Sequence, residues 1–490
     1  MKFFKSNFFY PFLVIWVFTF SQCKTISQPE EFFCNLLAGE ATQTSVVLQA
    51  RLHSSDTLIN NDIKGLEGYI KFCITRDLES QFYMESNFFH ATDSNDFIAK
   101  YEFAGLRPSQ KYFYRISYGR DSINTTSSAW NSFKTLNSSN SDKRISFVVV
   151  TGMNFDAFRN GNSKSNILKA DNDVLKSGFP AFHSVAASNP DFWIGNGDNV
   201  YYDKPEGSPA ISLQDMRMRW HWLFSMSDFN RMLSHTSTYW MMDDHDFRYN
   251  DCDTVLKYDE SGNPVLPDVS LGSSVFYEQV PLSSNNNEYR SSYRTHRLNK
   301  DVQIWMLEGR LFRSPNSIPD INGKSIWGST QLNWLKSTLK ESDAPFRIII
   351  SPTPLIGPDE ASKSDNHTNI GGFRTERDSL FNWLKNNGFR NNGLYFICGD
   401  RHWQYHSIDP SGFEEFSCGA LVDANARAGI SPGDTLSTDP LGTIIQPYIQ
   451  KEISGGFLFV SSHRDEFNSP LLFFRFYDDQ KKLLYAVQKF

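Results

Sequence analysis

Patterns of apolar and polar residues divide the chain into two parts. In the first part, residues 45–52 (SVVLQARL) and 112–116 alternate with a period of two, which is typical of strands with one buried face. Residues 66–74 form another such run, and turn-rich stretches separate the three. Short strands with turns between them predict an all-β sandwich of fibronectin or immunoglobulin type over residues 35–136.

From residue 145 the pattern changes to continuous apolar runs. Residues 145–150 (ISFVVV) are typical of a strand buried on both faces. Similar runs and the helical patterns between them predict a layered α/β/β/α domain over residues 144–490. The further strand runs are 191–194, 302–307, 346–350, 394–398, 455–460, 471–477 and 482–487, and the helical patterns are 213–224, 330–339 and 376–385.

Three other segments complete the organisation. Lys2, Lys5 and the apolar stretch 8–20 predict a signal peptide over residues 1–22, so we expect an exported protein that is periplasmic, extracellular or lipid-anchored at the cell surface. Cys23 is the candidate for that lipid anchor. The polar segment 137–143 (NSSNSDK) is predicted to be a linker. The long polar stretch 251–290 is predicted to be a lid or an insertion.

Composition narrows the range of partners. The chain has 490 residues and a formal net charge of −7, and it shows no broad basic field, so we expect no nucleic-acid partner. The five cysteines after Cys23 lack CxxC spacing, which argues against a zinc-thiolate site. One disulfide among them remains open.

Three acidic, histidine-bearing segments carry the candidate chemistry. Each begins as a buried strand and then breaks into Gly or Asp. Carboxylates and imidazoles at strand ends from distant parts of a chain predict a metal site, and three such segments indicate an enzyme site with two metals. The segments are 193–203 (WIGNGDNVYYD), 240–251 (WMMDDHDFRYND) and 396–407 (FICGDRHWQYHS).

The first two segments have distinct expected roles. Asp198 is expected to bridge two cations, and Tyr201 to ligate a metal or donate a hydrogen bond; an aspartate that caps a helix is the alternative. In the second segment, three carboxylates surround His245 and repel one another unless a cation compensates. We expect Asp244 and His245 to point to opposite sides, with Asp244 on metal and a protonated His245 as general acid. A solvated acidic loop is the alternative.

The third segment and two weaker ones complete the set. Asp400 and His402 are expected to share one side of an extended segment and chelate together, while Arg401 faces away. Arg310 follows the strand run 302–307 and suits a phosphate clamp, although a structural salt bridge explains it equally well. A Pro/Gly-rich loop (351–365), with His367 after it, is placed to lie over the site.

Five segments in this order resemble the alkaline phosphatase D (PhoD-type) family of metallophosphoesterases. They are GDNVYYD, DDHDFRYND, EGRLFRS, QLNWL (331–335) and GDRHWQYHS. The resemblance implies a fibronectin-like domain followed by a metallophosphoesterase domain. It also implies a dinuclear centre, with iron and calcium in some members, that hydrolyses phosphate mono- and diesters. The implied ligands are Asp198, Tyr201, Asp244, Asp400 and His402, and His245 is implied to assist the leaving group.

One position departs from that family. A cysteine that often ligates iron there corresponds to Gly152 in this chain. Without the thiolate, calcium, magnesium or manganese is expected in preference to iron. Asn154 is a candidate oxygen ligand nearby, and Asn250 and His367 are further candidates.

The sequence therefore predicts an exported phosphoesterase in which a metal-bound hydroxide attacks phosphorus, Arg310 neutralises charge and His245 protonates the leaving group. The expected substrate is a small phosphate ester or a cell-surface phosphodiester. The main alternative is a non-catalytic, metal-stabilised surface module that binds glycans or protein. A nuclease is less favoured because no basic groove is evident.

Overall fold

The computed structural model describes residues 32–80, 82–162, 167–258, 261–262, 267–282 and 292–490. The predicted signal peptide and Cys23 therefore lie outside the described residues. Residues Phe32–Phe490 form one compact unit. Within the described part of this unit, no helix has both the length and the apolar character that a membrane span requires.

The N-terminal region is all-β and is built from two facing sheets, as predicted. One sheet contributes β1 (Phe33–Gly39), β2 (Ser45–His53) and β6 (Ile98–Ala104). The facing sheet centres on β3 (Gly68–Thr75) and β7 (Lys111–Gly119). Apolar side chains of both sheets, including Leu48, Phe72 and Tyr114, form a core of their own. The short strands β4 (Met84–Glu85), β5 (Phe89–Ala91), β8 (Thr126–Ser127) and β9 (Asn131–Lys134) complete the region.

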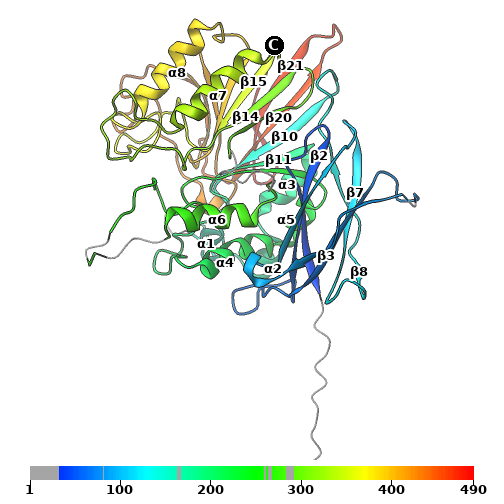
Figure 1. Cartoon of the computed structure of the whole chain (residues 1–490). Coiled ribbons are helices and arrows are strands. Elements are labelled where there is room, and N and C mark those ends of the chain that lie inside the picture. The colour runs from blue at the N-terminus through cyan, green and yellow to red at the C-terminus, as the bar shows by residue number, and fades with distance from the viewer. Residues whose placement is uncertain (1–31, 81, 163–166, 259–260, 263–266, 283–291) are drawn as a thin grey trace, which may run out of the picture. The chain divides into compact units, whose positions relative to one another are not determined.

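The first sheet of the sandwich continues into the larger domain. Strand β1 pairs in parallel with β12 (Ser237–Met241), with Gly39 opposite Thr238. The result is one nine-stranded sheet in the order β22-β21-β20-β10-β11-β12-β1-β2-β6 (Figure 1). Its other strands are β10 (Ile145–Val150), β11 (Phe192–Asn196), β20 (Gly456–Arg464), β21 (Pro470–Asp478) and β22 (Leu483–Lys489).

A second, seven-stranded sheet packs against the nine-stranded one. Its order is β13-β14-β15-β16-β18-β17-β19, and β14, β15, β16 and β18 run parallel to one another. Facing side chains such as Val149, Ile194, Ile348 and Phe416 fill the space between the sheets. The strands are β13 (Arg294–Arg297), β14 (Val302–Met306), β15 (Phe346–Ser351), β16 (Leu394–Cys398), β17 (Gln404–Ile408), β18 (Glu414–Cys418) and β19 (Ile445–Ile449).

Helices cover the outer faces of both sheets, so the predicted α/β/β/α layering is confirmed. Over the second sheet, α7 (Gly328–Glu341) and α8 (Arg374–Asn386) pack Leu335 and Leu380 against Ile349 (Figure 1). Over the first sheet lie α1 (Phe155–Asn160), α2 (Asn172–Ser177), α3 (Pro180–Ser188), α4 (Leu213–Phe224), α5 (Ser227–Leu233) and α6 (Val269–Gln279).

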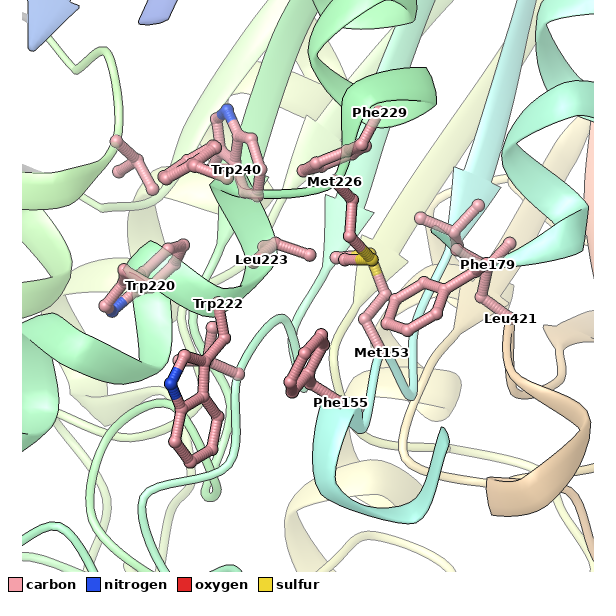
Figure 2. Packing of buried hydrophobic residues seen from close by; sticks show 14 of the residues in the cluster. Met153, Phe155, Phe179, Trp220, Trp222, Leu223, Met226, Phe229, Trp240 and Leu421 are labelled. Carbon is pink, nitrogen blue, oxygen red and sulfur yellow. The ribbon is translucent and has the colours of Figure 1, made fainter. Parts of the chain in front are cut away.

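An aromatic cluster anchors these helices to the first sheet (Figure 2). Trp220 and Trp222 come from α4 and Phe229 from α5, while Trp240 comes from β12. The rings of Trp220 and Trp240 lie 6.0 Å apart, edge to face. Burial of such large rings fixes the end of β12, from which the second acidic segment emerges.

The structure bears on the predictions for the stretch 251–290 and for the cysteines. The polar stretch 251–290, predicted to be a lid or an insertion, contains helix α6, which the sequence pattern did not indicate. Asp268 caps this helix by accepting a hydrogen bond from the Leu271 N–H (2.7 Å). The five cysteines in the described part of the chain are all free.

Candidate active site

The three acidic segments meet where parallel strands of the two sheets end. Asp198 follows β11, Asp244 and His245 follow β12, and Asp400 follows β16. The carboxyl ends of parallel strands are the usual position for ligands in such sheets. The predicted convergence of residues from distant parts of the chain is thus found.

The backbone is shaped to bring these loops close together. A Cβ atom on Gly197 would lie 2.4 Å from the Asp243 Cβ, so only glycine lets the loop after β11 approach the loop after β12. Asp198 and Asp400 both have left-handed backbones, with φ of 53° and 58°. Such conformations cost energy in residues other than glycine and gather at functional sites.

Asp198, Asp244 and His245 form the centre of the site. Each offers a ligand atom, and these atoms lie within 4.8 Å of one another although all three side chains are buried. Burial, together with the nearby Asp244 and Asp400 carboxylates, raises the pKa of Asp198 to about 7, against the opposing charge of His245. Its Oδ1 is buried and has no hydrogen-bond partner within the described part of the chain. A buried acidic oxygen that lacks a donor fits a bound cation.

The other Asp198 oxygen anchors two side chains. Tyr201 donates its hydroxyl proton to Asp198 Oδ2 at 2.8 Å, and His402 Nε2 lies 3.1 Å from the same oxygen. Burial, followed by the charge of Arg427, lowers the pKa of His402 well below its usual range, so this imidazole is neutral and suited to a metal. Tyr201 and His402 therefore lie where the sequence placed candidate ligands.

Asn425 is a further member of this group that the sequence did not indicate. Its Nδ2 donates to the Tyr201 hydroxyl at 2.8 Å and to the Gly152 carbonyl at 3.2 Å. Its Oδ1 accepts a bond from Asn154 Nδ2 at 3.4 Å. Asn425 lies on the 3-10 turn Asp423–Asn425, 224 residues after Tyr201.

Gly152 and its surroundings exclude a thiolate ligand at that position. Gly152 has φ of 67°, and a Cβ there would lie 3.2 Å from Asn425 Nδ2. Cys252 lies beside the second acidic loop, and its thiol bonds to the Asp244 carbonyl at 3.5 Å. Burial raises the pKa of Cys252 to about 12, so its sulfur stays protonated.

His245 is held by an acid that the sequence did not single out. Its Nδ1 lies 2.7 Å from Asp203 Oδ1, and its ring stacks on Tyr201 with ring centres 4.2 Å apart. Burial lowers its pKa, but the carboxylates of Asp244, Asp198 and Asp203 outweigh that effect and raise the pKa to about 10. His245 is therefore an imidazolium near neutral pH, with its Nε2–H available for donation.

The hydrogen bonds and charges around Asp244 differ from those around Asp198. Its Oδ2 accepts the Asp251 N–H at 2.6 Å, and Arg310 Nη2 lies 3.8 Å from Oδ1. Burial raises the pKa of Asp244, but the positive charges of His245 and Arg310 outweigh that effect and lower it. Asp244 is thus a stable carboxylate beside a protonated histidine.

Two orientations predicted from strand spacing were wrong. Asp244 and His245 do not point to opposite sides, because the chain turns directly after β12 and both contribute to the central cluster. Arg401 does not face away from Asp400. The left-handed backbone at Asp400 directs the buried Arg401 guanidinium into an ion pair with Asp400 and Asp359.

The side chains of Arg310 and His367 are both buried in the protein interior. The fully buried Arg310 donates from Nε to Asp243 Oδ1 at 2.6 Å, which is the salt-bridge alternative rather than a phosphate clamp. His367 is also fully buried, with Nε2 2.9 Å from Glu376. The loop 351–365 does lie beside the site, because Lys363 pairs with Asp251 at 2.8 Å.

A pocket of about 840 Å³ opens beside the cluster. His245, Tyr201 and His402 line its inner end. Asn154 and Asn250, the further candidates, also line it. Its remaining walls include Asn162, Asp203, Lys204, Glu206, Arg248, Tyr249, Asn425 and Arg427.

The fold and this site define a class of protein. Two packed sheets flanked by helices, with acidic loops of both sheets converging on a metal-fitting cluster, are the design of a metallophosphoesterase. A model of the PhoD-like phosphatase family matches residues 147–437, and a model of the PhoD-like phosphatase N-terminal domain matches residues 20–137. The chain belongs to the PhoD-like phosphatase family and is a phosphoric ester hydrolase.

Solved structures support the same fold. A structure of PhoD superposes with a TM-score of 0.69 and 16% identity, covering 92% of this chain and 91% of that one. A purple acid phosphatase, PPD1 from yellow lupin (Lupinus luteus) seeds, gives a TM-score of 0.58 and 11% identity, covering 94% and 75%. No curated protein sequence matches the chain.

Proposed function

We propose that this protein hydrolyses phosphate mono- or diesters at a centre of two divalent cations held by the three acidic loops. The ligands would be Asp198, Tyr201, Asp244, Asp400 and His402. The observation that carries the proposal is the pair of buried carboxylates Asp198 and Asp244 beside His245, in which Asp198 Oδ1 lacks a hydrogen-bond donor among the described residues.

The donor set favours hard cations. It consists of carboxylates, a phenol and a neutral imidazole, while the nearby thiol of Cys252 is protonated and Gly152 has no side chain. Oxygen-rich sites suit calcium, magnesium or manganese better than ions that prefer thiolates. When bound, such cations lower the pKa of water and neutralise phosphate oxygens.

His245 would serve as the general acid. Asp203 fixes its Nδ1 at 2.7 Å, so the proton available for transfer is on Nε2. As a water oxygen bonds to phosphorus and the P–O ester bond breaks, the proton would pass to the oxygen of the departing alcohol. Tyr201, which stacks on the ring, would hold the imidazole plane in place.

Arg310 would act from behind the site instead of touching phosphate. It neutralises Asp243 and lies 3.8 Å from Asp244, and so it offsets the repulsion among the carboxylates. The pocket of about 840 Å³ beside His245 would hold the organic part of the ester. Its volume supports a substrate larger than phosphate itself.

Export is part of the proposal. The basis is the sequence of residues 1–22, with a basic start and an apolar run that suit a signal peptide. Cell fractionation that found the full-length chain in the cytoplasm would contradict it.

The catalytic proposal is tested with three variants of the purified protein and two chromogenic substrates, a phosphate monoester and a diester. Asp198→Asn and Asp400→Asn should lose both activity and metal, measured by elemental analysis. His245→Ala should lose activity but keep metal, because it is proposed to move a proton and not to ligate. Full activity in all three variants would reject the assignment of the site.

A further inference from the structure

A basic groove lies on the outer face of the nine-stranded sheet, away from the acidic loops. It has a volume of about 670 Å³ and is bounded by β20, β21, the end of α3 and the residue before β10. Arg144, His463, Arg475 and Lys481 line it together with Ser461 and Tyr477, and no carboxylate is among the described lining residues. The groove is therefore locally positive, although the chain as a whole has a net charge of −7.

The groove and the metal site lie at opposite ends of β10. Ile145, which follows Arg144, is paired with Ser462 of β20 at one end of β10. Gly152 lies just beyond the other end of β10. Strand β10 has six residues, which corresponds to a length of about 20 Å. An anion in the groove would therefore be separate from phosphate at the metal site.

Three of the four basic side chains, those of Arg475, Lys481 and His463, are held in place by the protein. Arg475 donates from Nη1 to Ser461 Oγ at 2.8 Å, and its guanidinium carbon lies 4.5 Å from the centre of the Phe473 ring. Lys481 donates to the Ala187 carbonyl at 2.6 Å, at the end of α3. The ring of His463 stacks on Phe473 with centres 5.1 Å apart. Because these contacts fix the side chains in advance, little conformational entropy is lost when an anion binds.

The groove also brings two guanidinium groups close together. Burial, followed by the charge of Arg144, lowers the pKa of Arg475, so the two guanidiniums repel each other. Two acids of the adjoining turns bond to backbone N–H groups. Asp478 accepts the N–H groups of Gln480 and Lys482, and Asp465 accepts those of Phe467 and Ser469.

We propose that this groove is a second anion site, which binds a ligand with two or more phosphate-type oxyanion groups. Guanidinium forks match the geometry of such oxyanions. The groove volume of about 670 Å³ is larger than a single oxyanion needs. The fixed Arg475 and Lys481, together with the exposed Arg144, place several cations along one groove and favour a ligand with more than one anionic group.

The test is calorimetric titration with pyrophosphate at low ionic strength, where charge interactions are least screened. The full-length chain carries Asp198→Asn throughout, so that the metal site contributes little to binding. Arg144→Gln/Arg475→Gln is compared with the matched double variant Arg76→Gln/Arg390→Gln, which removes the same charge from exposed positions outside the groove. Thermal unfolding midpoints confirm that all the proteins are folded.

The expected result is binding that weakens at least tenfold in the groove variant and stays unchanged in the matched control. Inorganic phosphate should bind the parent at least tenfold more weakly than pyrophosphate. Equal affinity in all variants, or no binding to the parent, would overturn the site. Phosphate binding as tight as pyrophosphate would overturn the requirement for two groups. Since this test does not involve ester hydrolysis, its failure is distinguishable from failure of the catalytic proposal.

Discussion

Individual carboxylates in this protein are tuned in opposite directions within a few ångströms. Burial and neighbouring acids raise the pKa of Asp198, whereas His245 and Arg310 overcome burial and lower that of Asp244. The difference comes from geometry, because only Asp244 has a backbone N–H donor and a nearby guanidinium. A cation would complete the environment of Asp198, which explains why such a costly group is buried there.

The pairing of His245 with Asp203 predicts a specific pH dependence. The acid form of His245 is the active one, and its pKa is raised to about 10 when no cation is bound, so the alkaline limb of the kcat profile should lie below that value in the metal-loaded protein. Bound cations oppose the protonated form and move the limb downward. Asp203→Asn removes a partner that raises the pKa, and should shift the alkaline limb of the kcat profile roughly 1 unit lower.

The matched control for this shift is Asp173→Asn, an exposed acid on α2 that makes no described contact with His245. Its profile should overlie that of the wild type. A profile of Asp203→Asn that falls in amplitude at every pH without moving would show that Asp203 is structural only.

Asn425 predicts an effect on metal affinity. Its N–H donates to the Tyr201 oxygen, which favours the ionised phenol that a metal would bind. Asn425→Ala should therefore weaken metal binding about 10-fold or more. Titration calorimetry of the metal-depleted protein measures this. Asn160→Ala, an exposed amide on α1, should bind metal as the wild type does, and equal affinity of both variants would contradict the role.

At the scale of elements, helix α6 supports the second acidic loop from outside. Gly272 lies in its interior, and a Cβ there would come within 1.9 Å of the Phe247 carbonyl oxygen. Alanine is normally favoured over glycine in a helix by about 1 kcal/mol. In Gly272→Ala the clash should outweigh this preference and lower the free energy of unfolding by about 1–3 kcal/mol. The loop after β12 cannot move away, because the packed core lies behind it.

Gly272→Ala should consequently lower the melting temperature and also the metal content, because Phe247 directly follows the acidic run 243–246. Gly207→Ala is the matched control, since a Cβ at Gly207 meets nothing within 4 Å. An unchanged melting temperature for Gly272→Ala would show that α6 adjusts freely.

The same helix shows where sequence patterns stop being informative. Continuous apolar runs such as 145–150 and 394–398 located β10 and β16 without error, because strands buried on both faces have few alternatives. Helix α6 buries Gly272, Ser273 and Gln279 beside two apolar residues, so its buried face is not apolar enough to recognise.

The residues of the site also divide into those that the sequence indicated and those that it did not. Asp198, Asp244 and Asp400 were recognisable because each follows a buried strand. Asp203 belongs to the first acidic segment, but its role was not recognisable because its partner is 42 residues away. Asn425 was not recognisable because its partner is 224 residues away and no motif surrounds it. Strand spacing also assumed an extended chain at Asp400, whereas its φ is 58°.

At the scale of the whole molecule, the sandwich and the larger domain are joined by more than the polar segment between them. Strand β1 pairs with β12, and His221 of α4 bridges Asp62 and Asp96 of the sandwich at 2.6 and 2.7 Å. Arg51 also pairs with Asp96 in this buried network. Because removing one partner would leave buried charges uncompensated, neither part should unfold alone.

Calorimetry should therefore show a single unfolding transition for the full-length chain, in place of the two expected for loosely linked domains. His221→Gln should lower the melting temperature, because it removes the partner that bridges Asp62 and Asp96. Two well-separated transitions in the wild type would contradict the coupling.

The central claim, that the three acidic loops form a metal-dependent phosphoesterase site, is tested most directly by one measurement. The rate of hydrolysis of a chromogenic phosphate ester is followed for chelator-treated protein as calcium, magnesium or manganese is added back, for the wild type and for Asp198→Asn. The account predicts that the wild type loses its activity and regains it with at least one of these ions, while folded Asp198→Asn stays inactive with all of them. Undiminished hydrolysis by metal-depleted wild type, or wild-type rates for Asp198→Asn, would contradict it.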